Sequence, residues 1–520
     1  MSMPSWLPPL LPWIYYVASA TILLWDTFLA GQIAQQRTAP RPFAFMSALG
    51  ALLLAPALLV AAAAGSSLAG RTFDALAWIW PAVTLLFTLQ TMYAVGRRML
   101  TPLLGLPILA YDLLLTAVTT TRYALALGAT PPHWAMILAV AHVNVLGYVT
   151  GPTALWSPLA LQLPLLAPAF PARWRISQSL RAIIAMLAVV WCVATGLELP
   201  AADSAIRSYA SLAAEPLQER PAGDFTVGLR LLPIVDGAPT ASALRNDLAL
   251  VDSTGAEAVS VLIDPHAHAA ALDSLARALE PLRRDTTVLI VTVGYAADAA
   301  LAARRSPSAF AAARLADISR IVRRLHPDYL LPADEPYGRA ARVLGRRPVT
   351  YWIRYLTDAA AAARRVDPHV KIGLAIAAFD TRDSALYAWA AGPQSPIDVL
   401  GFILAPDFTG GAALDAKMRT ADRWMAAAPT PIKEQWVFAA RGFPVAHGEA
   451  NQARAVWAAL AWATSRAAIK GLVVADAGDY DDLSGLRTPA GRLRPVVDVV
   501  SRATRSLRET SVPQASVDSE

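Results

Sequence analysis

The sequence predicts a membrane α-helical domain followed by an α/β domain of the (β/α)₈ (TIM) barrel type. Three observations support this fold class. Apolar residues are concentrated before residue 200, where the chain holds nine arginines, no lysine and only four acids. After about residue 224, eight short apolar runs alternate with stretches of helical periodicity. The fourth run ends in Asp334-Glu335-Pro336, and acids at the carboxyl ends of barrel strands are candidates for a functional role.

The composition fits a membrane protein with a globular part. The chain has 520 residues, 55% of them hydrophobic, which exceeds the apolar share of ordinary soluble proteins. The net charge of +6 comes from scattered arginines rather than a basic run, so we expect no nucleic-acid partner. The single cysteine, Cys192, allows no disulfide within the chain, and no zinc-ligand spacing is present. We therefore expect neither a metal nor a cofactor.

Six apolar stretches have the length of a transmembrane helix. They lie at residues 10–30, 44–69, 75–96, 100–128, 134–170 and 180–199. Arginines follow the first and third stretches and precede the last: Arg37, Arg41, Arg97, Arg98, Arg173, Arg175 and Arg181. Placing all of them in the cytoplasm requires 134–170 to cross once, which predicts six spans with both termini outside. If that proline-broken stretch crosses twice, seven spans would place the C-terminal domain in the cytoplasm.

Several polar residues fall within or near the predicted spans. They are Asp26, Asp112, Arg122, His142 and Asn144. Ionisable groups in a bilayer are costly and often functional. The simpler interpretation is that they form contacts between helices or reach the interface from a helix end.

The C-terminal part divides into eight strand-and-helix units. The predicted strands are Phe225–Pro233, Ala258–Asp264, Thr287–Tyr295, Tyr329–Ala333, Val370–Phe379, Val399–Ala405, Ile432–Ala440 and Gly471–Ala475. No glycine-rich phosphate loop follows the first strand, which favours a barrel over a doubly wound sheet. We predict a transmembrane domain over 1–200, a linker over 201–222, the barrel over 223–507 and a disordered tail over 508–520.

Polar side chains gather where the predicted strands end. The candidate ligand-contacting residues are Asp264, His266, Tyr295, Asp334, Glu335, Asp380, Asp407, Arg441 and Asp476. Carboxylates accept hydrogen bonds from hydroxyl groups, so this rim suits a neutral polyhydroxylated ligand such as a carbohydrate. Helix N-capping is the alternative role for each single aspartate.

With these residues in place, the barrel resembles the clan A glycoside hydrolases. Asp334-Glu335-Pro336 is similar to the Asn-Glu-Pro motif that this family carries after strand 4, and Gly485–Pro495 resembles its last turn into helix 8. The resemblance covers about residues 224–505. It implies that Glu335 is the general acid/base and that a second carboxylate stands at the end of strand 7.

The second carboxylate departs from the family pattern. Aligning Trp436–Pro444 on strand 7 puts Ala440 at the place of the nucleophile. Glu434 is the nearest glutamate, but it would lie at the beginning of that strand. Three options follow: Glu434 acts as nucleophile after all, Asp380, Asp407 or Asp476 serves in an inverting arrangement, or the barrel binds glycan without cleaving it.

The expected function is that of a glycoside hydrolase-like protein, anchored in the inner (cytoplasmic) membrane, that acts on or binds polysaccharide. Its expected partners are a carbohydrate ligand, the lipid bilayer and other polysaccharide-export components, and its barrel would be periplasmic or otherwise extracytoplasmic. One alternative is an inactive glycan-binding partner of a polysaccharide synthesis or export system. Another is a membrane transport subunit with an accessory barrel. If chemistry occurs, we expect Glu335 to carry the proton; a salt bridge to Arg441 would instead make it a poor acid.

Overall fold

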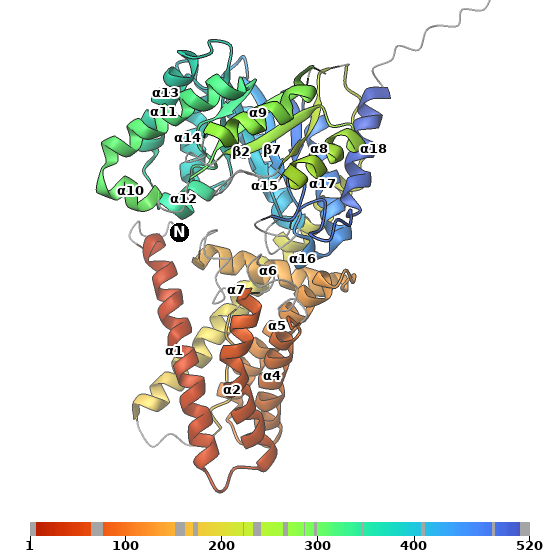
Figure 1. Cartoon of the computed structure of the whole chain (residues 1–520). Coiled ribbons are helices and arrows are strands. Elements are labelled where there is room, and N and C mark those ends of the chain that lie inside the picture. Colours follow the sequence, from red (N-terminus) through yellow and green to blue (C-terminus); the bar gives the residue numbers. More distant parts are fainter. Residues whose placement is uncertain are drawn as a thin grey trace, which may run out of the picture. The chain divides into compact units, whose positions relative to one another are not determined.

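The structure is a computed structural model, and the chain in it divides into two compact units (Figure 1). The first comprises Met1–Arg207 with Phe408–Ala412 and Pro444–Gly448, and the second comprises Ser208–Asp407, Ala413–Phe443 and Glu449–Glu520. The structure describes residues 7–63, 76–150, 162–169, 175–221, 223–231, 241–263, 269–284, 287–295, 299–345, 347–406, 411–480 and 484–509.

The first unit is built from apolar helices. They are α1 (Leu7–Gln35), α2 (Arg41–Ala63), α4 (Ile79–Gly96), α5 (Pro102–Ala126), α6 (His133–Thr150) and α7 (Arg175–Leu212). Among the described residues, five helices are long and apolar enough to cross a membrane, and α6 contributes a shorter apolar helix, His133–Val149. The first part of the predicted linker over 201–222 is helical. The chain from Ala201 to Leu212 contains no glycine or proline, and α7 continues through it.

A buried, non-helical segment, residues 162–169, belongs to this unit. Three of its backbone N–H groups donate to side chains of three helices: Leu165 to Asp112 (2.9 Å), Leu166 to Asp26 (3.0 Å) and Ala167 to Gln90 (2.9 Å). The Tyr111 hydroxyl donates to the Leu163 carbonyl at 2.8 Å. Extended backbone needs such partners where water is excluded. Asp26 and Asp112 therefore hold this segment among the helices.

A further predicted polar contact between helices is confirmed. The indole Nε1 of Trp191, on α7, donates to Nδ1 of His142, on α6, at 3.3 Å. His142 is buried, with 2% of its surface exposed. A buried imidazole with a hydrogen-bond partner is satisfied without any ligand.

Replacing Asp112 by leucine should destabilise the helical unit by about 2–4 kcal/mol, because the Leu165 N–H and the Thr91 hydroxyl would both lose a buried acceptor. Asp112→Asn keeps an acceptor oxygen and should cost less than half as much. The thermal unfolding midpoint of the full chain in detergent measures both variants. Equal midpoints for Asp112→Leu and the wild type would show that Asp112 does not hold the segment.

The second unit is a closed barrel of eight parallel strands in sequential order. All eight predicted strands are confirmed, as β1 (Thr226–Arg230), β2 (Ala258–Ile263), β3 (Val288–Val293), β4 (Tyr329–Leu331), β5 (Lys371–Ile376), β6 (Val399–Leu404), β7 (Glu434–Ala440) and β8 (Ile469–Val474). The connecting helices are α8 (Ala241–Thr254), α9 (Ala269–Arg284), α10 (Ala299–Arg305), α11 (Pro307–Leu325), α12 (Arg339–Leu344), α13 (Val349–Arg364), α14 (Thr381–Ala391), α15 (Gly411–Ala427), α17 (Glu449–Thr464) and α18 (Val496–Glu509). The short helix α16 (Pro444–His447) follows β7 in sequence and belongs to the first unit.

Two aromatic side chains of β7 occupy the barrel interior. Trp436 and Phe438 stack with their ring centres 6.2 Å apart, and both are buried. They face glycines of the neighbouring strands, Gly401 on β6 and Gly471 on β8, where an added Cβ would collide with the rings. Large side chains on one strand therefore require small residues on the next, as in the packed core of such barrels.

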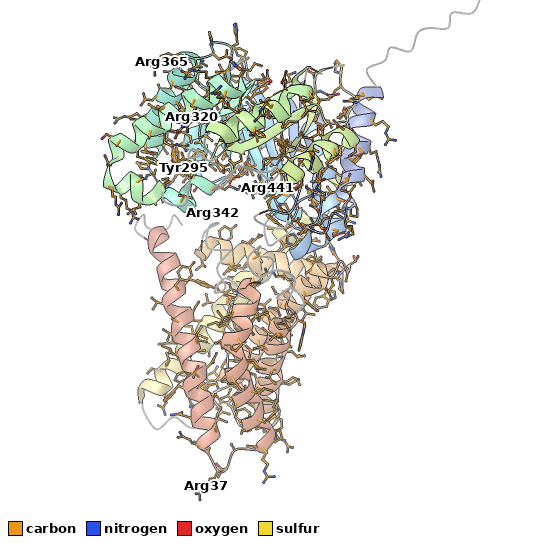
Figure 2. The ribbon with its side chains drawn as sticks, viewed as in Figure 1. Arg37, Tyr295, Arg320, Arg342, Arg365 and Arg441 are labelled. Carbon is orange, nitrogen blue, oxygen red and sulfur yellow. The ribbon has the colours of Figure 1, made fainter. Side chains whose placement is uncertain are left out.

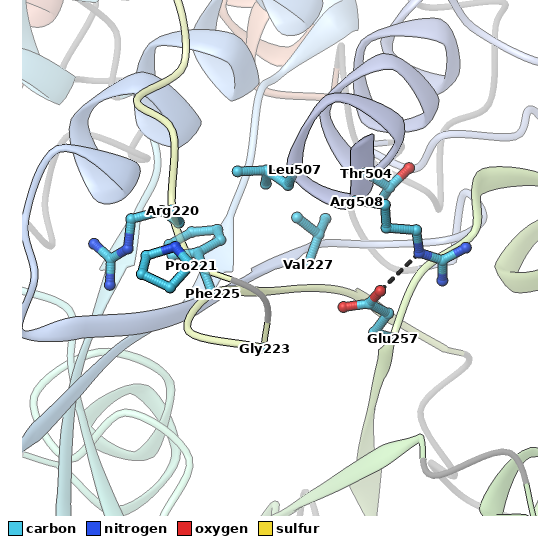
Figure 3. A pocket seen from close by; sticks show the side chains of 9 residues that line it. All are labelled: Arg220, Pro221, Gly223, Phe225, Val227, Glu257, Thr504, Leu507 and Arg508. Carbon is cyan, nitrogen blue, oxygen red and sulfur yellow. Dashed lines mark hydrogen bonds and ion pairs between the residues drawn. The ribbon is translucent and has the colours of Figure 1, made fainter. Parts of the chain in front are cut away.

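A hollow of about 110 Å³ lies at the amino-terminal end of β1 and β2 (Figure 3). The charged groups that line it are paired: Arg508 donates to Glu257 at 2.7 Å, and Arg220 pairs with Asp224 at 2.6 Å. It lies at the end of the strands opposite to Glu335. The Arg508–Glu257 pair joins α18 to the start of β2, and the Arg220–Asp224 pair lies in the segment before β1. These contacts indicate a structural role.

Candidate functional site

The turn after β4 carries the two acids of the Asp-Glu-Pro motif. β4 ends at Leu331, and Asp334 and Glu335 are 7% and 5% exposed. Glu335 has a φ of 51°, in the left-handed region that non-glycine residues rarely adopt. At Gly338 an added Cβ would lie 2.8 Å from the Cβ of Glu335 and 2.9 Å from that of Ala377. Only glycine permits this close approach, so the turn is packed tightly around the Glu335 side chain.

Three arginines from separate elements surround these acids. Arg230 is the last residue of β1, Arg339 is the first of α12, and Arg441 directly follows β7. Oε1 of Glu335 lies 3.8 Å from Nη2 of Arg441 and 3.9 Å from Nε of Arg339. Asp476, after β8, forms a buried ion pair with Arg230. The carboxyl end of the barrel thus holds a buried network of alternating charges, which includes Arg441 (Figure 2).

The network sets the protonation of its carboxyl groups. Burial would raise the pKa of Glu335, but the guanidinium groups of Arg339, Arg441 and Arg230 outweigh it and hold that pKa below its usual range. Burial likewise opposes ionisation of Asp476, yet Arg230 and Arg441 lower its pKa to about 2. Glu335 and Asp476 are therefore ionised at neutral pH.

Asp334 behaves in the opposite way. Burial and the neighbouring charge of Glu335 raise its pKa, and the nearby arginines compensate only in part. Burial, together with the charges of Arg230 and Arg339, lowers the pKa of Arg441 to about 10. Asp334, rather than Glu335, is therefore the better candidate proton carrier of the motif.

The end of β7 carries no carboxylate. The strand ends at Ala440, and Arg441 follows. Glu434 is the first residue of the same strand, and six residue steps separate it from Ala440 by about 20 Å. It accepts hydrogen bonds from Tyr329 (2.6 Å) and Lys371 (2.7 Å) at the amino-terminal end. The structure does not bring Glu434 to Glu335, because the strand does not end early.

The other candidate ligand-contacting residues lie apart from the Glu335 network or outside the described residues. Tyr295, two residues beyond β3, is partly exposed, and its ring packs against Arg314 and Trp352. The Asp380 carboxylate caps the N-terminus of α14, where it accepts hydrogen bonds from the backbone N–H groups of Arg382 and Asp383. For this residue, helix N-capping is therefore the role that the structure shows. Asp264, His266 and Asp407 lie outside the described residues.

Three site residues escaped sequence reasoning: Arg230, Arg339 and Arg314. A charged residue in the apolar strand β1 was a signal for Arg230. The spacing of four residues between Glu335 and Arg339 was a second one, since it allows an ion pair within one turn. No local signal marks Arg314, whose partners lie on other elements. Within the described ranges, no group of three or more His, Cys, Asp or Glu residues could hold a metal ion.

Comparison with known proteins provides information on the fold alone. No protein-family model and no curated protein matches the sequence. Among solved structures, the chain is similar to a β-glucuronidase from Ruminococcus gnavus in complex with D-glucuronic acid, at 12% identity and a TM-score of 0.40, over 54% of this chain and 49% of that one. It is also similar to GH5_18 from Bifidobacterium longum subsp. longum, at 12% identity and a TM-score of 0.43, over 55% and 80%.

A GH5_18 variant from Streptomyces cattleya in complex with Manb1-4GlcNAc shares 16% identity at a TM-score of 0.42, over 56% of this chain and 81% of that one. The matched part spans about half the length of the glucuronidase. At these identities and TM-scores, the similarity assigns neither an activity nor a substrate to this chain. The barrel's own strand order establishes that the second unit is a (β/α)₈ barrel.

Proposed function

We propose that this protein is a membrane-anchored, glycoside hydrolase-like barrel that binds polysaccharide outside the cytoplasm without cleaving it. One observation carries the proposal: Glu335 is ion-paired to Arg339 and Arg441 and lacks a carboxylate opposite it at the end of β7. Retaining glycosidases need such a carboxylate about 5–5.5 Å from the acid. A glutamate whose proton is lost well below neutral pH is also a poor general acid.

The apolar helices support anchoring in the inner membrane. Five of them, among the described residues, have spanning length and composition. Arg37 lies where α1 leads into α2 (Figure 2), and Arg97 and Arg98 lie between α4 and α5. With these arginines in the cytoplasm, six crossings carry the chain after α7 to the other side.

A reporter fused after Leu212 tests this orientation. We expect alkaline phosphatase, which is active only outside the cytoplasm, to be active at that position. A cytoplasm-only reporter such as β-galactosidase should be inactive there. The reverse pattern would place the barrel in the cytoplasm and support seven spans.

Hydrolysis is the second candidate function, and the behaviour of Asp334 favours it. Carboxyl groups whose environments push their pKa values apart are the usual mark of an acid and a base. Here the pKa of Asp334 is raised, whereas that of Asp476 is lowered to about 2. In this mechanism Asp334 would protonate the leaving oxygen, and Asp476 or Glu335 would act as base or nucleophile.

Binding and cleavage can be separated on the full chain in detergent. Cello-, manno- and xylohexaose serve as probes, calorimetry measures binding, and released reducing ends measure cleavage. We expect binding without reducing ends, in the wild type and in Glu335→Gln alike. Glu219→Gln, on an exposed glutamate, is the matched control.

Two outcomes would contradict the binding proposal. Release of reducing ends by the wild type that Asp334→Asn abolishes would establish the hydrolase. Absence of both binding and cleavage for these probes would leave the membrane transport alternative, with the barrel as an accessory domain.

A further inference from the structure

Arg314 is a buried arginine near the turn that carries Asp334 and Glu335. It projects from α11 and is 2% exposed. Among the described residues, its hydrogen bonds go to backbone carbonyls and to the hydroxyl of Tyr355 rather than to a carboxylate. A buried guanidinium is costly unless its donors are satisfied. Here backbone carbonyls and a tyrosine hydroxyl satisfy them, and the charge of Asp317 on the same helix also favours the charged form of Arg314.

The guanidinium of Arg314 joins the ends of two adjacent strands. Nη1 donates to the carbonyl of Gly294 at 2.5 Å, directly after β3. Nη2 donates to the carbonyl of Pro332 at 3.0 Å, directly after β4. The Tyr355 hydroxyl donates to the same Pro332 carbonyl at 2.8 Å. Pro332 stands two residues before Asp334, so these bonds position the start of the turn that carries the acids.

The same guanidinium positions the ring of Tyr295. Its central carbon lies 4.0 Å from the ring centre, a cation–π contact. Trp352 approaches that ring edge-on, with the ring centres 6.5 Å apart. Tyr295 is labelled in Figure 2 and remains partly exposed at the carboxyl end of β3. A ring held in this way offers a preorganised aromatic surface to a ligand.

We infer that Arg314 is a positioning residue of the glycan site, which sets the Tyr295 ring and the turn after β4 in one arrangement. The inference rests on the proposed function for its ligand. The planar fork of arginine supplies donors in fixed directions together with a stacking face, whereas lysine offers a point charge on a flexible stem. Arg314→Lys should therefore keep the charge but lose the arrangement.

The test uses the full chain labelled with 3-fluorotyrosine, in detergent. The ¹⁹F resonance of Tyr295 is identified by its absence from Tyr295→Phe. In Arg314→Lys we expect this resonance to shift or broaden. Affinity for whichever hexaose the wild type binds should fall by about tenfold, as expected when an anchoring aromatic is displaced. Arg323→Lys, at an exposed arginine of the same helix, should change neither.

The outcomes separate this inference from the proposed function. An unchanged Tyr295 resonance and unchanged affinity in Arg314→Lys would overturn the inference and leave Arg314 a purely stabilising residue. If the wild type binds none of the hexaoses, the proposed function fails, and the resonance alone still decides whether Arg314 positions Tyr295. If Arg314→Lys does not fold, Tyr355→Phe tests the arrangement, because it removes the hydroxyl that accepts from Nε and Nη2 of Arg314 and so releases the guanidinium from its position. An unchanged resonance and affinity in that variant would overturn the inference.

Discussion

Replacing Asp476 by asparagine should destabilise the barrel by about 3–5 kcal/mol, the usual cost of leaving one partner of a buried ion pair uncompensated. Arg230 and Asp476 are each 6% exposed, and their ion pair joins the ends of β1 and β8, the strands that close the barrel. The unfolding transition of the barrel in urea, followed by tryptophan fluorescence of the full chain in detergent, measures the loss.

Two control variants test whether the loss of stability in Asp476→Asn comes from the unpaired buried charge. Glu257→Gln removes an acid from the exposed pair with Arg508 and should cost less than about 1 kcal/mol. The double variant Arg230→Met/Asp476→Leu removes both charges and should recover most of the stability. If Asp476→Asn costs no more than Glu257→Gln, the Arg230–Asp476 pair contributes nothing beyond a surface contact.

The same pair predicts an acid dependence. The pKa of Asp476 is lowered to about 2 in the folded protein, whereas an unfolded aspartate has a pKa of about 3.9. Its contribution is therefore fully present above about pH 4 and is lost as the pH falls through about 2. In the Asp476→Asn variant, the free energy of unfolding should depend less on pH in this range and should depend on pH as in the wild type outside it.

Replacing Gly401 by alanine should destabilise the barrel by about 3 kcal/mol, at the upper end of the usual cost of overpacking. The new Cβ would lie 2.7 Å from the carbonyl oxygen of Trp436 and still closer to the ring of Phe438. The ring can rotate in part, but the carbonyl cannot retreat without disturbing the pairing of Gly401 with Trp436 between β6 and β7. Urea unfolding measures this loss as well.

A second-site change and a control sharpen the Gly401 prediction. Gly401→Ala/Phe438→Leu relieves the ring contact but not the contact with the backbone, so it should restore part of the stability and not all of it. At Gly294 an added Cβ would meet nothing nearer than 3.4 Å, and Gly294→Ala should cost little. Full restoration by Phe438→Leu would show that the backbone contact is unimportant.

Local sequence patterns were sufficient for the architecture. Each barrel strand is a short apolar run ended by polar residues, and such a run indicates a buried strand wherever it occurs in the chain. The helices of the first unit follow from apolar length in the same way. The position of Glu434 could be read as well, because the apolar run through Trp436 and Phe438 places it at the beginning of β7.

The chemical state of the site depended on residues that are distant in sequence. Arg230 ends β1 and Arg441 directly follows β7, and closure of the barrel brings them to Asp476 and Glu335. The partners of the 162–169 segment, Asp26, Gln90 and Asp112, likewise lie on α1, α4 and α5. A pKa or a buried hydrogen bond is set by the charges and donors within a few ångströms in space. The periodicity of the sequence does not show which distant residues become neighbours in space. The ionised state of Glu335 and the role of Asp112 therefore depend on the tertiary structure and could not be predicted from the sequence.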